Sequence, residues 1–141
     1  MYREQVTTQD EALCHLFFHC SMKDAKFDEA ELEMVSGKMV EMGLQSKLDF
    51  KEEIIKYNNY KSTITNEDAY LQYLIEKINP VNDIALYSYC IEILLSDAHM
   101  DIAEDSLSNK IAAALKLETP AQEITKKLML QRKVIETNKI V

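Results

Sequence analysis

The chain has 141 residues, of which 47% are hydrophobic, and a formal net charge of −8 at pH 7. This length suits one domain with a sizeable core, and two Gly and two Pro leave too few turn residues for an all-β fold. The acidic surface disfavours nucleic acid and anionic lipid as partners, and no apolar run approaches the ~20 residues that span a bilayer.

The first residues, MYREQVTTQDEA, lack the apolar core of a signal peptide. We therefore expect a cytoplasmic protein without membrane insertion, in which the cysteines are reduced thiols. Cys14, Cys20 and Cys90 all lie in apolar helical stretches, where a free cysteine packs as a small hydrophobe.

Hydrophobic spacing predicts an all-α fold, a compact bundle of about seven helices in a single domain over residues 1–141. Thr65 or Asn66 is expected to cap the fourth helix, Asn79-Pro80 to end it, and Gly43 to follow the second helix as its C′ residue. In the last helix, Ile124, Leu128, Gln131 and Ile135 share one face. In chain order, two helices are expected on either side of an acidic turn at 24–28, followed by two linking helices within about 46–79. Two more are expected on either side of a second acidic turn at 97–101, and a last helix over about 120–138.

An internal duplication underlies this organisation. Residues 24–31 read DAKFDEAE and residues 97–104 read DAHMDIAE, which match at an offset of 73 positions. The same register aligns windows 9–44 and 82–117 without a gap. Chance similarity between amphipathic helices would match apolar positions but would not readily reproduce three acids at fixed spacing. We therefore predict two copies of a helix–acidic-turn–helix unit.

The acids of the two turns are candidate metal ligands: Asp24, Asp28, Glu31, Asp97, Asp101 and Glu104. Calcium takes ~6–8 oxygen ligands, so two apposed carboxylate turns could hold a divalent cation. A purely structural reading is also open, because Asp28 with Glu31, and Asp101 with Glu104, have the spacing of a helix N-cap with a Glu at the third helical position.

These turns make the sequence similar to the TerB-like tellurite-resistance family, in which a leading aspartate is followed seven residues later by a glutamate at a helix start. Here those pairs are Asp24 with Glu31, and Asp97 with Glu104. The resemblance covers most of the chain, although alanine follows each leading aspartate where the family usually has glycine. It implies a non-enzymatic binding or scaffold protein of tellurite-resistance or stress systems, with acidic residues suspected of binding calcium.

His15 and His19 lie four residues apart on one helix face, a spacing that can bind zinc or copper. The duplication aligns them with the polar residues Ser88 and Glu92, so we interpret the histidines as solvent-exposed rather than as a metal site.

No nucleophile motif, phosphate-binding loop or metalloprotease motif occurs in the sequence, so we expect no catalytic or cofactor-binding residues. The favoured function is a non-catalytic scaffold that binds another protein. Two alternatives stay open: a phosphoryl-transfer enzyme whose metal ions are held by the six carboxylates, and a purely structural protein-interaction domain.

Overall fold

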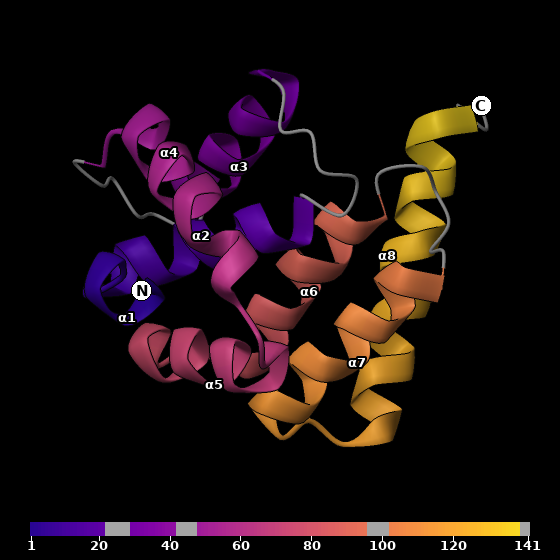
Figure 1. Ribbon diagram of the computed structural model, residues 1–141. Helices are drawn as coiled ribbons and strands as arrows, with labels where there is room; N and C mark the ends of the chain where they lie inside the picture. Colours follow the sequence, from indigo (N-terminus) through magenta and orange to yellow (C-terminus); the bar gives the residue numbers. More distant parts are fainter. Residues whose placement is uncertain (22–28, 42–47, 96–101, 139–141) are drawn as a thin grey trace. The chain divides into compact units, whose positions relative to one another are not determined.

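The computed structural model describes residues 1–21, 29–41, 48–95 and 102–138. These ranges contain eight α-helices, one short 3-10 turn and no strand (Figure 1), which confirms the all-α prediction. Seven of the helices correspond to those expected from the sequence, and the additional one is α1 at the start of the chain. No helix in the described ranges is both long and apolar enough to cross a membrane.

The elements follow one another with short connections. The bounds are α1 (Tyr2–Gln5), α2 (Gln9–Ser21), α3 (Glu29–Glu41), α4 (Phe50–Tyr60), the 3-10 turn η1 (Lys61–Thr63), α5 (Glu67–Ile78), α6 (Asp83–Leu94), α7 (Ile102–Leu115) and α8 (Thr119–Asn138).

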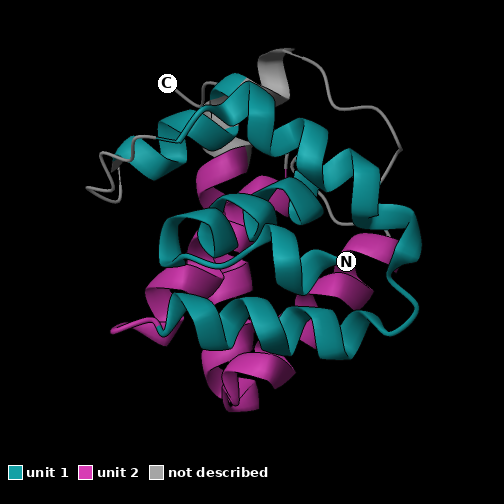
Figure 2. Ribbon diagram, turned by 60° about the vertical axis from the view of Figure 1, so that its left-hand side comes forward, with its two compact units in different colours: residues 1–79 teal, residues 80–141 magenta. Residues whose placement is uncertain are grey.

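The chain divides into two compact units, which Figure 2 distinguishes by colour: unit 1 is residues 1–79 and unit 2 is residues 80–141. Each unit holds one of the two sequence windows proposed as copies, 9–44 in unit 1 and 82–117 in unit 2. The duplication itself and the single-domain organisation stay predictions.

In unit 1, α2 is the central helix and packs against α3, α4 and α5. All seven residues from 12 to 18 are buried, so every face of this helix is covered. Its sequence therefore has no polar face for solvent, and any polar residue in it must find partners inside the protein.

In unit 2, α6 packs against α7 and α8. The face of α8 predicted from spacing is not the one that is buried, since Ile124 is 67% and Leu128 is 52% exposed. Thr125 and Met129, one residue further along the helix, are buried instead. Thr125 satisfies its hydroxyl with the Ala121 carbonyl of its own helix, which allows a polar residue on this face.

Helix starts follow local capping chemistry. The side chain of Asn66 accepts a hydrogen bond from the Ala69 amide, as predicted, and Asn82 does the same for the Ala85 amide. Asp49 caps α4 by accepting from the Lys51 and Glu52 amides. Helix α5 ends at Asn79, whose left-handed conformation (φ 47°) precedes Pro80.

The end of α7 is a Schellman motif. The Leu117 amide donates to the Ala112 carbonyl and the Lys116 amide donates to the Ala113 carbonyl, at 3.0 and 3.1 Å. Lys116 has a positive φ of 58°. The repeat register aligns Lys116 with Gly43, the predicted C′ glycine of the first copy, which itself lies outside the described residues.

We expect Lys116→Gly to increase the free energy of unfolding by about 1 kcal/mol, because a left-handed backbone is strained for any residue with a Cβ atom. Urea denaturation measures the change. The same substitution at Lys127, an exposed position inside α8, is the control and should lower stability by about 1 kcal/mol. A loss of stability in both variants would contradict the assignment of strain to Lys116.

Candidate functional site

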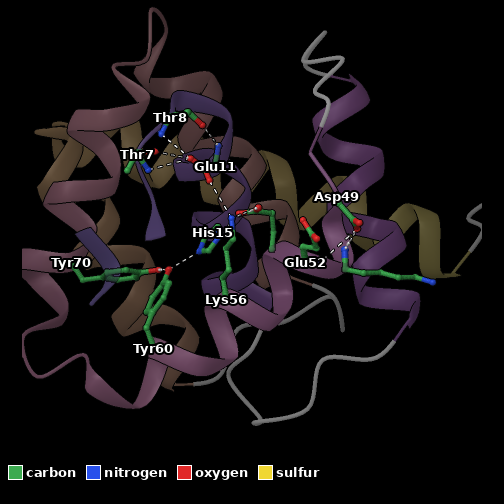
Figure 3. Close-up of polar contacts among 11 residues, drawn as sticks. Thr7, Thr8, Glu11, His15, Asp49, Glu52, Lys56, Tyr60 and Tyr70 are labelled. Atoms are coloured by element: carbon green, nitrogen blue, oxygen red, sulfur yellow. Dashed lines mark hydrogen bonds and ion pairs between the residues drawn. The ribbon is translucent and has the colours of Figure 1, made fainter. Parts of the chain in front are cut away.

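A buried polar network lies at the centre of unit 1, and Figure 3 shows part of it. The ring of His15, on α2, lies between two side chains of α4. Its Nδ1 atom is 2.6 Å from the Tyr60 hydroxyl and its Nε2 atom is 2.8 Å from Glu53 Oε1. The Tyr60 hydroxyl is in turn 2.7 Å from the Tyr70 hydroxyl of α5. This chain of contacts joins three helices.

His19, one helical turn further along α2, repeats the arrangement. Its Nδ1 atom is 2.8 Å from the Tyr57 hydroxyl on α4, and its Nε2 atom is 2.7 Å from Glu67 Oε2 on α5. We call both sets of contacts together the histidine network: Glu53, His15, Tyr60 and Tyr70, with Glu67, His19 and Tyr57. In both sets a histidine stands between a tyrosine and a glutamate, with the same ring nitrogen facing each partner.

These contacts assign the direction of each hydrogen bond when the histidines are neutral. An ionised carboxylate can only accept, so Nε2–H of His15 donates to Glu53. Nδ1 then accepts from the Tyr60 hydroxyl, and the Tyr60 oxygen accepts from Tyr70. Each donor in this chain has an acceptor, which makes the buried set self-sufficient.

On its other side, the network reaches the surface through two charged residues. Lys56 Nζ is 3.1 Å from Glu53 Oε2 and 3.6 Å from Glu11 Oε2. Glu11 in turn accepts hydrogen bonds from Thr7 and Thr8. The buried Glu53 carboxylate is therefore paired both with His15 and with a cation at the edge of the unit.

Burial controls the chemistry of the tyrosines. Tyr57 and Tyr60 are 3% and 2% exposed. Loss of water around the phenols raises the pKa of both residues well above the ordinary value. The hydroxyls therefore stay protonated at neutral pH and act as hydrogen-bond donors, not as nucleophiles.

The prediction that the histidines are exposed is wrong. His15 is completely buried, and the side chain of His19 is only 13% exposed. The comparison with Ser88 and Glu92 was misleading because α4 and α5, which supply the partners of the histidines, lie outside the two windows proposed as copies. The cysteines are free and buried as expected.

The buried side of α4 does not follow its aliphatic residues, since Ile55 is 59% exposed. The residues buried on this helix are Glu53, Tyr57 and Tyr60, which recur at a helical spacing of four and three. That spacing is visible in the sequence, but a glutamate in the row hides it from a search for apolar residues.

The acidic turns lie mostly outside the described residues, as do Asp24, Asp28, Asp97 and Asp101. Helices α3 and α7 begin at Glu29 and Ile102, directly after Asp28 and Asp101. Glu31 and Glu104 are accordingly the third residues of their helices, and Glu104 is 5% exposed. The side chain of Glu31 is not described.

Within the described ranges, no three His, Cys, Asp or Glu side chains are grouped so that they could hold a metal ion. Four of the six proposed ligands fall outside those ranges, so cation binding by the turns stays a prediction. Comparison with protein-family models, curated proteins and solved structures finds no match. The TerB-like resemblance therefore also stays a prediction.

We expect His15→Leu to lower the free energy of unfolding by about 3 kcal/mol, because it leaves the buried Oε1 atom of Glu53 without its donor and the Tyr60 hydroxyl without its acceptor. His19→Leu is the matched comparison and should cost about 1 kcal/mol. It also leaves a buried hydroxyl, that of Tyr57, without its acceptor, but the side chain of Glu67 is 34% exposed and retains contact with water. Urea denaturation at neutral pH measures both losses. Equal losses of stability in the two variants would show that the different burial of Glu53 and Glu67 does not determine the cost of removing each histidine.

Proposed function

We propose that this chain is a non-catalytic binding or scaffold protein of the TerB-like kind, which acts in the cytoplasm and binds another protein. In this proposal the two acidic turns bind a divalent cation such as Ca²⁺. The observation that supports a non-catalytic role is the closed form of the histidine network, whose hydroxyls and ring nitrogens are used inside unit 1.

The histidine network contains the residue types of a nucleophilic site: a hydroxyl, a histidine and a carboxylate. A hydroxyl bonded to a histidine that a carboxylate orients is the arrangement that activates serine in hydrolases. A nucleophile must also reach its substrate. The Tyr57 and Tyr60 hydroxyls are buried, and burial raises the pKa of both phenols, so each hydroxyl is unreactive where it lies. The arrangement thus supports packing rather than catalysis.

Support for the cation comes from the helix boundaries. Helices α3 and α7 begin at Glu29 and Ile102, positions that match at the offset of 73, and the acids of each turn come just before or within the first turn of these helices in the sequence. Each turn offers three aligned carboxylates within eight residues, to which the first turn adds Glu29, and oxygen-rich sites of this kind suit calcium. The net charge of −8 also favours cations over anions as ligands.

Calorimetric titration of metal-stripped protein with Ca²⁺, Mg²⁺ and Zn²⁺ tests the cation. We expect saturable Ca²⁺ binding that is at least about tenfold weaker in an Asp24→Ala/Asp97→Ala variant, because a hard cation loses one carboxylate ligand from each turn. The control is Asp10→Ala/Asp83→Ala, another repeat-aligned acid pair outside the turns, which should leave binding unchanged.

Two outcomes would contradict the proposal in different ways. Absence of heat with every ion would remove cation binding and leave the acids as helix caps. Hydrolysis of a phosphate ester in the presence of Mn²⁺, abolished by Asp24→Ala/Asp97→Ala, would instead establish the metal-dependent enzyme and overturn the non-catalytic role.

A further inference from the structure

The segment of residues 2–8, which we call the strap, contacts two places. One is Tyr70 of the histidine network, and the other is Glu11, which lies beside Lys56 at the edge of the unit. At one end, the ring of Tyr2 contacts the edge of Tyr70 with ring centroids 4.9 Å apart. The Tyr73 hydroxyl also donates to the Val6 carbonyl at 2.6 Å, and Val6 is completely buried. At the other end, Thr7 and Thr8 contact Glu11.

A single carboxylate oxygen holds that second end. Glu11 Oε1 accepts from the Thr7 amide at 3.2 Å, the Thr7 hydroxyl at 3.1 Å and the Thr8 amide at 3.0 Å. The Glu11 amide donates back to the Thr8 hydroxyl, which completes a capping box at the start of α2. An ionised carboxylate suits three donors far better than a neutral carboxyl group does.

The charged and titratable groups around Glu11 come from three helices. Lys56 of α4 lies 3.6 Å from its second oxygen, and Glu53 is bound to the same lysine. The negative charge of Glu11 also contributes to raising the pKa of Tyr73 on α5 and of Cys14 on α2. Lys56 is the cation among these groups and favours the ionised form of Glu11.

We propose that residues 2–8 form a strap that the ionised Glu11 carboxylate holds closed, and that protonation of Glu11 opens this strap while α2, α4 and α5 stay folded. Opening uncovers the rings of Tyr70 and Tyr73. Tyrosine is enriched at protein interfaces, so the device would control access to an aromatic face of unit 1. It does not depend on cation binding by the acidic turns.

The direction of the pH dependence follows from the contacts. Burial acts to raise the pKa of Glu11, but hydrogen bonds from Thr7 and Thr8 outweigh it and lower the pKa below the ordinary value. A carboxyl group with a lowered pKa in the folded state contributes stability that is fully present above the pKa of the unfolded chain. That contribution is lost as the pH falls through the folded value, so the strap is closed at neutral pH and opens in acid.

Amide exchange measured by NMR on the full chain tests the strap directly. The reporters are four strap amides that donate to the Met1 carbonyl, to the Tyr2 carbonyl or to Glu11: Glu4, Val6, Thr7 and Thr8. We expect Glu11→Gln to accelerate exchange at all four by at least about tenfold at neutral pH, because the charge-assisted hydrogen bonds are lost. Amides in α4 and α5 should be unchanged. Asp10→Asn removes the neighbouring charge at the same helix end and should have no effect on the four reporters.

Two results would overturn the proposal. Faster exchange at Thr7 and Thr8 alone would show that Glu11 only caps α2, and equal acceleration throughout α2, α4 and α5 would show that no separate strap exists. If Glu11→Gln does not fold, acid titration of the unaltered chain decides the question. The strap amides must then lose protection at a higher pH than the amides of α4 and α5, and a shared midpoint would refute the device.

Discussion

The hydrogen bond between the buried His15 ring and Glu53 is the contact on which the packing of unit 1 depends. A carboxylate taken out of water is strongly destabilising unless it is paired and hydrogen-bonded. Here Glu53 has His15 on one oxygen and Lys56 on the other. Because the opposite nitrogen of His15 must then face Tyr60, the rotation of α2 relative to α4 is fixed by two contacts from the same ring.

The contact between His15 and Glu53 selects one rotation of α2, which apolar packing alone would not do. Helix α2 is buried on every face, and apolar contacts such as those of Leu13, Leu16 and Phe17 are non-directional. A rotation that took His15 away from α4 would leave Oε1 of Glu53 and the His15 ring without their hydrogen bonds. The network therefore favours one rotation of α2 over others, a specificity role that buried polar groups have in some proteins.

What the sequence reveals about this fold depends on how local the interaction is. The caps at Asn66 and the end of α5 at Asn79 are set by residues within one helical turn, and they are readable. The Thr8–Glu11 capping box is equally local, because T-x-x-E is its usual pattern. Its glutamate stands apart from the two acidic turns, and only the pairing with Thr8 three residues earlier marks it as a cap.

The histidine network could not be read in the same way. His15 and Glu53 are 38 positions apart, and His19 and Glu67 are 48 apart. Helical spacing identifies residues that share a face but not which face a neighbouring helix covers. The same limitation explains α8, where spacing correctly grouped Ile124 with Leu128 but gave no information on whether that face is buried.

The two windows proposed as copies, 9–44 and 82–117, differ at the positions of the buried histidines and agree at three acids of the turns. His15 and His19 are replaced by Ser88 and Glu92, and the Ser88 hydroxyl simply bonds to the Ala85 carbonyl of its own helix. Both turns nevertheless keep the same three acids. Capping alone does not require that identity, because the four caps seen in the described residues use three residue types, at Thr8, Asp49, Asn66 and Asn82. In the sequence, Asp24 and Asp97 each stand five positions before the first residue of the following helix, too far away for an N-cap. The recurrence of these two acids is what the proposed cation binding would explain.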